Sequence, residues 1–302
     1  MERLLPGCFG GYIMNNKIKL NTLAFITIIF WSAAYPLTKV ASQDFDCYTI
    51  TALRAFIAAA VMLIIGLVTH IRKIFKFSHV WLFAIEGAFA FSLYVIVFNI
   101  GLQSLTTTTS SLIIATVPIF TAIGAWKIFG EKLKPVGWIS MGTAFAGVCI
   151  LLLWDGDLSI GIGALWTFIA VLMFSAYNLI NRKLENLGYN SMELVTYALI
   201  FGAIELLPFA PRAVGQIMTA DTSSLMAIIF MGIGTSALAY YTWSKALTYA
   251  DKLNEVTNYL FLSPFITAVL GWLMLAEIPG AGIYIGGAII MLSLIVFSVK
   301  GR

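Results

Sequence analysis

Polar and aromatic side chains recur at helical spacing inside apolar segments of this sequence. Trp31, Tyr35 and Thr38 are four and three residues apart, and Asn178 and Asn181 are three apart, so each set lies on one face of a predicted helix. Indole, phenol and amide groups hydrogen-bond a ligand but supply no activated nucleophile, so these faces predict reversible binding of a small molecule. The predicted binding residues are Trp31, Tyr35, Tyr94, Asn99, Tyr177, Asn178, Asn181, Tyr240, Trp243 and Asn258.

Two other roles are open for the same residues. Asparagine amides inside a membrane also hydrogen-bond neighbouring helices, and Tyr and Trp near the ends of a span often belong to the interfacial belt. Trp31, Tyr94 and Tyr177 lie well inside their apolar segments, which argues against the belt for these three.

Four charged residues are candidates for ion coupling or for the mouth of a binding site, because a charge at mid-helix costs roughly 2.5–3.5 kcal/mol on insertion scales. Lys39 is expected either to extend to the lipid head groups or to attract a substrate carboxylate at the outer mouth. Arg54 and Glu205 lie towards the outer ends of their segments and are expected either to pair or to act in gating. Glu86 is expected either to cap its helix or extend towards the head groups near the helix start, or to carry a proton. With no acid near the middle of a segment, we expect a cavity without a central fixed charge, which suits a zwitterion or a neutral polar molecule.

Two prolines and two glutamates follow a common pattern. Pro118 and Pro264 interrupt helical hydrogen bonding within their segments, and are predicted to mark kinks that are either hinges or static bends. Glu131 and Glu277 each stand 13 residues further on and are predicted to cap the first turn of the helix that follows.

Composition excludes a soluble protein. Of 302 residues, 60% are hydrophobic and 11% charged, with a mean hydropathy of +0.94, whereas soluble domains carry about 25% charged residues. The net charge of +4 is assigned to loops that face anionic head groups, so no nucleic-acid partner is expected. Three cysteines without a CxxC pair and two histidines in one short loop predict no metal site, cofactor or disulfide framework.

Ten segments have the roughly 20 apolar residues that cross a bilayer as a helix. They are residues 22–41, 49–69, 80–102, 107–128, 136–154, 160–181, 191–209, 224–247, 255–275 and 281–299. Lipid cannot hydrogen-bond exposed backbone groups, so an all-α integral membrane protein is predicted. The longest connection, residues 210–223, is too small for a catalytic domain, so no enzyme is expected.

Orientation follows from the basic residues. A cytoplasmic N-terminus places fifteen of the 18 Lys and Arg residues on the cytoplasmic side, so both termini are predicted to be cytoplasmic. Residues 1–21 are assigned to a cytoplasmic N-terminal tail, in which Met14 is a second candidate start.

The chain repeats itself at an offset of 146 residues. Pro118, Thr121, Ala122, Trp126 and Glu131 recur as Pro264, Thr267, Ala268, Trp272 and Glu277. The halves, residues 22–154 and 160–299, each hold five predicted helices. Because five is odd, the second half starts on the opposite side of the membrane, and such inverted repeats place a binding site near the midplane between them.

Several of these motifs together resemble the EamA family of the drug/metabolite transporter superfamily. They are the segment from Trp31 to Tyr35 with Lys39, Arg54 in the second helix, and the Pro–x12–Glu pattern that ends both fourth helices. The resemblance covers residues 22–299 and departs at Ser32, where the family commonly has Gly. It implies export of amino acids or other small metabolites across a bacterial inner membrane, often linked to protons.

The predicted function is therefore a secondary active transporter that exports amino acids or related metabolites by alternating access, as a monomer or homodimer. No nucleotide-binding P-loop occurs, so an ion gradient, with H+ as the candidate, or the substrate's own gradient would drive it. Multidrug efflux is an alternative, although the first helix lacks the acid that cationic drugs favour. Sugar-phosphate or nucleotide-sugar exchange, a membrane-embedded enzyme and a channel are further alternatives.

Overall fold

The computed structural model describes residues 6–69, 74–132, 134–154, 158–278 and 280–300, and these contain helices and short connections with no strand. In the N-terminal half the helices are α1 (Pro6–Ala41), α2 (Cys47–Thr69), α3 (Val80–Ala90), α4 (Leu93–Gln103), α5 (Thr107–Ile114), α6 (Val117–Phe129) and α7 (Pro135–Leu153), with a 3₁₀ turn, η1, at Phe77–His79. In the C-terminal half they are α8 (Leu158–Asn186), α9 (Ser191–Leu206), α10 (Ala210–Ile217), α11 (Thr222–Phe230), α12 (Ala239–Leu247), α13 (Asn254–Thr257), α14 (Ser263–Leu275) and α15 (Ala281–Lys300). Three short helical elements join neighbours: the 3₁₀ turn η2 (Leu207–Phe209), the π-helix η3 (Met231–Leu238) and the 3₁₀ helix η4 (Asn258–Leu262).

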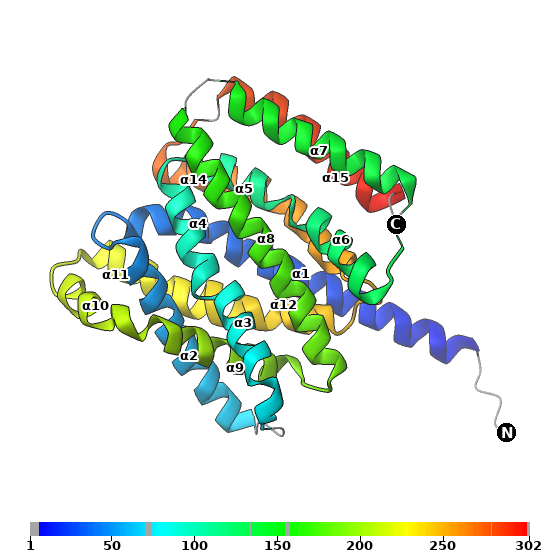
Figure 1. The fold of residues 1–302 in the computed structure, drawn as a ribbon, viewed down its shortest axis with the longest axis horizontal. Helices are drawn as coiled ribbons and strands as arrows, with labels where there is room; N and C mark the ends of the chain where they lie inside the picture. The colour runs from blue at the N-terminus through cyan, green and yellow to red at the C-terminus, as the bar shows by residue number, and fades with distance from the viewer. Residues whose placement is uncertain (1–5, 70–73, 133, 155–157, 279, 301–302) are drawn as a thin grey trace.

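Within the described residues, eight helical segments are long and apolar enough to cross a membrane, and the apolar part of α15, Ala281–Phe297, is a shorter ninth. The fifth predicted span coincides with α7, which packs lengthwise against α15 at one edge of the bundle (Figure 1). The all-helical prediction is therefore confirmed, while the count of ten spans and the cytoplasmic placement of both termini stay predictions.

The first helix begins earlier than expected. Residues 6–21 continue α1 instead of forming a separate tail, and residues 1–5 lie outside the described chain. The predicted span, residues 22–41, contains only the most apolar part of the helix. The helical backbone also includes the more polar residues that precede it. Lys19 on this extension lies 5.7 Å from the centre of the Tyr249 ring, so a cation–π contact ties the extension to the bundle.

Four of the long segments are interrupted near their middles. The α3–α4 break falls at Phe91 and Ser92, and adding 146 leads to residues 237 and 238, at the end of η3. The α5–α6 break falls at Ala115 and Thr116, and the same offset leads to residues 261 and 262, at the end of η4. Helix interruptions thus occur at equivalent places in the two halves.

The two repeat-related prolines explain one pair of interruptions. Pro118 is the second residue of α6 and Pro264 is the second residue of α14. Proline has no N–H to donate and is favoured in the first turn of a helix. Each new helix therefore begins one residue before its proline, and the missing N–H interrupts the hydrogen bonding to the preceding turn. Whether these positions act as hinges stays a prediction.

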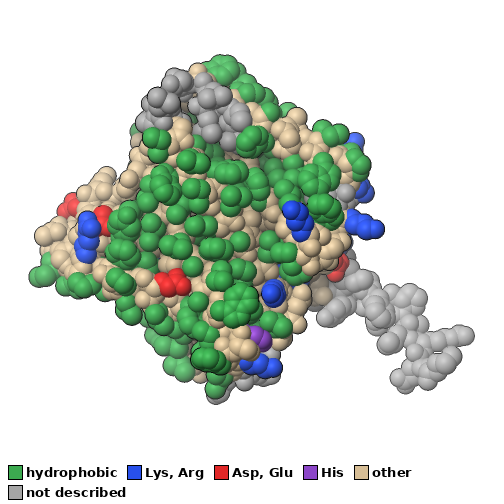
Figure 2. Space-filling model, in the orientation of Figure 1, with side chains coloured by type: hydrophobic (Ala, Val, Ile, Leu, Met, Phe, Trp, Pro, Cys, Tyr) green, Lys and Arg blue, Asp and Glu red, His purple; other side chains and the backbone are tan. Residues whose placement is uncertain are grey.

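Apolar side chains fill the interior and also face outward. Trp243, Tyr177, Phe83 and Phe174 are among the largest fully buried side chains. Hydrophobic side chains also cover most of the middle of the face seen in Figure 2, with many of the Lys and Arg residues near its edges. Such a surface suits lipid contact and not water.

Glycine permits the closest contact between two of these helices. A Cβ on Gly87 of α3 would lie 2.6 Å from the carbonyl oxygen of Ala198 and 2.7 Å from the backbone nitrogen of Gly202, both on α9. The two helices therefore meet backbone to backbone, as membrane helices do where small residues line the interface.

We expect Gly87→Ala to destabilise the protein by about 1–3 kcal/mol, because the added methyl group meets rigid backbone atoms. Gly142→Ala on α7 is the matched control, since no atom lies within 4 Å of its Cβ position and alanine is the better helix former. Thermal unfolding of both variants in detergent measures the difference. Equal melting temperatures for the two variants would contradict the proposed close contact.

Candidate functional site

A small cavity of about 40 Å³ lies among helices of the bundle. Its lining comes from both halves of the chain: Trp31, Ala34, Tyr35, Arg54, Tyr94, Val95, Phe98, Ile114, Phe174, Tyr240, Leu260 and Ser263. Four of the ten predicted binding residues line it: Trp31, Tyr35, Tyr94 and Tyr240. Small-molecule pockets usually have about 300–1,000 Å³, so the cavity has to expand before it holds a metabolite.

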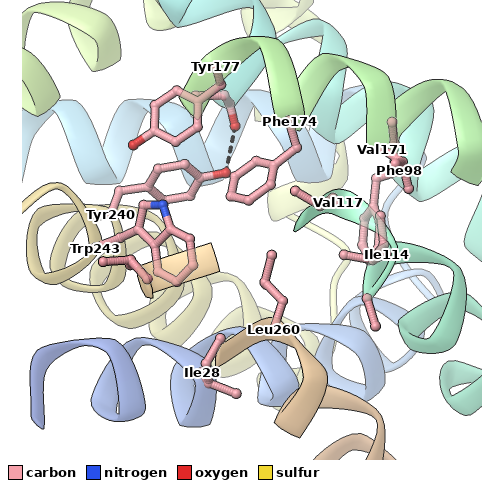
Figure 3. Packing of buried hydrophobic residues seen from close by; sticks show 14 of the residues in the cluster. Ile28, Phe98, Ile114, Val117, Val171, Phe174, Tyr177, Tyr240, Trp243 and Leu260 are labelled. Atoms are coloured by element: carbon pink, nitrogen blue, oxygen red, sulfur yellow. Dashed lines mark hydrogen bonds between the residues drawn. The ribbon is translucent and has the colours of Figure 1, made fainter. Parts of the chain in front are cut away.

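Aromatic rings form one wall of the cavity and hold each other in place. The Trp31 ring centre lies 5.2 Å from that of Phe174 and 5.1 Å from that of Tyr240, both in edge-on geometry. The Trp31 indole donates to the carbonyl of Thr235 at 3.0 Å, and the Tyr240 hydroxyl donates to the carbonyl of Ala90 at 2.9 Å. Figure 3 shows Phe174 and Tyr240 converging beside Tyr177 and Trp243. The helix interruptions therefore help to position the cavity lining, because Ala90 lies next to the α3–α4 break and Thr235 lies within η3.

Arg54 is a charged group in this lining, contrary to the expectation of a cavity without central fixed charge. The side chain is 6% exposed. Its Nε donates to the Ser236 hydroxyl at 3.3 Å, and one terminal nitrogen, Nη2, donates to the Thr235 hydroxyl at 3.1 Å and to Ser236 at 3.3 Å. Both hydroxyls belong to η3, whose π-helical geometry places two consecutive side chains against α2.

The expected pairing of Arg54 with Glu205 is wrong. Glu205 is exposed on α9 and accepts a short hydrogen bond from the Ser92 hydroxyl, so it anchors the α3–α4 break and lies apart from the guanidinium. Similar depth along two helices did not imply contact, because the two side chains face different neighbours.

Glu86 is fully buried and belongs to a second polar cluster, on α3 and α8. Its Oε1 accepts from the Asn181 amide at 2.9 Å, and the Asn181 oxygen accepts from Ser244 at 3.4 Å. The Oε2 atom has no hydrogen-bond partner in the described part of the chain. Burial argues against a cap or an extended side chain near the helix start, and the proton-carrying role stays a prediction.

The remaining predicted binding residues lie outside the cavity lining. The Asn178 oxygen accepts from the Trp243 indole at 2.8 Å, which joins α8 to α12, and the Tyr177 ring stacks on Phe174. Asn99 donates to Thr51 at 3.2 Å. Asn258 lies with Lys17 in a separate groove of about 620 Å³. Asn99, Asn178 and Asn181 thus join helices in this conformation, and their binding role stays a prediction.

Lys39 and Glu277 form an ion pair that the sequence did not predict. The Lys39 ammonium lies 2.9 Å from Glu277, whose other oxygen accepts from the Thr107 backbone N–H at 2.9 Å and from its hydroxyl at 2.6 Å. Glu277 therefore caps α5 of the other half, not the following helix as expected. Glu131 accepts a backbone hydrogen bond from Leu253, and residue 253 is residue 107 plus the repeat offset, so the two halves cap each other reciprocally.

The two capping carboxyls differ electrostatically. Partial burial raises the pKa of Glu277, but the hydrogen bonds from Thr107 and Lys39 outweigh it and hold the pKa below its ordinary value. Burial raises the pKa of Glu131 above the ordinary value, and the attraction of Arg182 only partly offsets it. At neutral pH the ionised form is therefore stabilised at Glu277 and disfavoured at Glu131.

Comparison with known proteins gives a consistent result. The EamA-like transporter family model matches residues 18–153 and again residues 161–299. The uncharacterized transporter YdfC of Bacillus subtilis is 23% identical over 87% of this chain and 86% of its own length. A probable terminal-alkyne amino-acid exporter of Streptantibioticus cattleyicolor is 23% identical over 87% and 88%.

Two further matches are a transporter and a solved structure. The riboflavin transporter of Vibrio cholerae is 28% identical over 60% of this chain and 59% of its own. A crystal structure matches with a TM-score of 0.67 at 20% identity, over 93% of this chain and 98% of that one, which shows a common fold.

We expect Glu277→Gln to lower the stability by about 1 kcal/mol at pH 7, because it removes a charge-assisted contact from a partly solvated site. The contribution of Glu277 is present above the ordinary Glu pKa of about 4.3 and is lost as the pH falls below it. Thermal unfolding from pH 7 down to about pH 2 measures this loss, which falls in the acidic part of the range. Glu131→Gln is the matched control, and its stability should equal or exceed the parent's at pH 7. An equal decrease in both variants would contradict the asymmetry.

Proposed function

The chain belongs to the EamA-like transporter family and is a multi-pass membrane transporter, and we propose that it is a secondary active transporter that exports amino acids or related small metabolites across the inner membrane of a bacterium by alternating access. We propose ten spans arranged as two inverted repeats of five, with both termini in the cytoplasm. The cavity lined by residues of both halves is the observation that carries this proposal.

Contacts between the halves support alternating access. On the proposed outer side, Glu277 joins Lys39 of α1 to Thr107 at the start of α5. On the proposed cytoplasmic side, Glu131 of the first half lies near Leu253 of the second half. Contacts between the halves are thus present on both proposed sides in this conformation. Breaking one set of contacts while the other persists would open the cavity to one side at a time.

Glu86 is the candidate for proton coupling. The Glu86 carboxyl group accepts a hydrogen bond from one neutral donor, the Asn181 amide of α8. The ionisable group that faces it is Tyr177, which is also on α8. No cation contacts it among the residues of the described structure. An ionised carboxylate would have little to offset its desolvation. We therefore propose that Glu86 carries a proton in this conformation and releases it when water reaches the site.

Counterflow in reconstituted vesicles tests the transport class. Vesicles that contain the full chain and an unlabelled metabolite should take up the same labelled metabolite faster than empty vesicles do, because only a carrier couples the two fluxes. The 20 amino acids and riboflavin form the first panel. If no member of a broad metabolite panel exchanges, the carrier mechanism is wrong.

We expect Glu86→Gln to retain counterflow but to lose acceleration of transport by a pH gradient, because glutamine imitates the protonated acid and cannot release a proton. Glu185→Gln is the matched control, since Glu185 lies at the end of α8, outside the Glu86 cluster, and pairs with Arg182 at 3.3 Å. Its gradient-driven transport should match the parent protein. Undiminished gradient-driven transport by the Glu86 variant would exclude this residue as the coupling site.

A further inference from the structure

The guanidinium of Arg54 has spare hydrogen-bonding capacity at the centre of the bundle. Its printed bonds use Nε and Nη2, and the second terminal nitrogen, Nη1, has no acceptor among the residues described. Ser236 and Thr235 are neutral hydroxyls, and no carboxylate of the described residues forms an ion pair with Arg54. A buried cation normally has an anionic partner. The missing partner here has a place to bind, because Arg54 lines the central cavity.

The rest of the lining limits the chemistry of that partner. Arg54 is the one charged residue among those that line the cavity, and aromatic rings surround it. A single guanidinium matches one carboxylate with two parallel hydrogen bonds. A phosphate, with nearly twice the charge, would call for a second cation, and an organic cation would meet repulsion without an acid to offset it.

The aromatic side chains of the lining indicate the chemistry of the rest of the ligand, beyond its anionic group. Trp31 and Tyr240 are fixed by their bonds to backbone carbonyls, so their ring faces and edges provide a rigid, mostly apolar surface. Tyr94 stacks beside Phe98 and near Phe174, at 6.1 and 5.3 Å between ring centres. Such a wall suits an apolar or aromatic body, and ring faces also accept an ammonium group through cation–π contact.

We propose that Arg54 binds the carboxylate of the transported substrate, with the apolar body of that substrate against Trp31, Tyr94 and Tyr240. The substrate class is thus a small carboxylic acid, amino acids with apolar side chains included. This inference rests on the proposed transport function and specifies its substrate. It reassigns the recognition of a substrate carboxylate from Lys39, which is paired with Glu277, to a residue at the centre.

Four probes that share a phenyl ring test the assignment: L-phenylalanine, hydrocinnamate, phenethylamine and phenyl phosphate. A ligand that binds the folded state raises the melting temperature, so thermal shifts of the purified full chain report binding. We expect L-phenylalanine and hydrocinnamate to stabilise the parent protein, and phenethylamine and phenyl phosphate to have at least tenfold lower affinity. Stabilisation by phenethylamine alone, by phenyl phosphate alone, or by none of the four would overturn the proposal without requiring any variant.

Variants locate the contact. Arg54→Gln should weaken hydrocinnamate binding about tenfold or more, which is the usual effect of losing a hydrogen bond to a charged group. Arg54→Lys should give an intermediate loss, because lysine keeps the positive charge but lacks the two parallel N–H donors of the guanidinium. Arg212→Gln is the matched control, since Arg212 is exposed on α10 and pairs with Asp46 at 2.7 Å. Unchanged hydrocinnamate binding in Arg54→Gln, or an equal loss in Arg212→Gln, would contradict the assignment.

Counterflow separates this inference from the proposed function. Exchange of hydrocinnamate or L-phenylalanine that fails in the Arg54 variants supports both. Exchange confined to substrates without a carboxylate preserves the carrier mechanism and overturns the role of Arg54. Absence of exchange for every metabolite tested rejects the carrier itself.

Discussion

A guanidinium buried among aromatic rings is the constraint around which the centre of this protein is organised. A charge in that environment is stable only if nearby groups offset its desolvation. In this structure two hydroxyls on one π-helical stretch do so in part. The π-helix changes the register of side chains along the α11–α12 segment, so that Thr235 and Ser236 both reach α2. Irregular backbone at this depth is tolerated because it lines a cavity inside the protein and not lipid.

A few charged side chains also determine the contacts at the ends of the bundle. Glu277 and Glu131 are equivalent under the repeat, and each receives a backbone hydrogen bond from the start of a segment in the other half. Reciprocal caps tie the halves together on both sides of the cavity. Their surroundings have diverged, because Lys39 pairs with Glu277, whereas burial dominates at Glu131. A symmetric scaffold therefore has two inter-half contacts that differ in charge and burial.

The two polar clusters suggest a division of labour between substrate and proton. Arg54 faces the cavity, whereas Glu86 is enclosed by α3 and α8 behind the aromatic wall. Phe174 and Tyr177 lie on α8 between these regions and stack on each other. In the proposed cycle, movement of α8 would affect both the cavity and the surroundings of Glu86, and the proposed coupling would act through this helix.

The sequence alone determined the helical class, the approximate bounds of the spans, the helix restarts at Pro118 and Pro264, and four of the cavity residues. These depend on local properties: apolar length, the missing N–H of proline, and the three- and four-residue spacing that keeps Trp31 and Tyr35 on one face. Only the tertiary structure decided the partners of the polar groups. Arg54 meets Ser236 instead of Glu205, and Glu277 caps α5 instead of the following helix. These partners lie more than 100 residues away, and which of them meet depends on helix rotation and on the π-helical change of register, neither of which local spacing specifies.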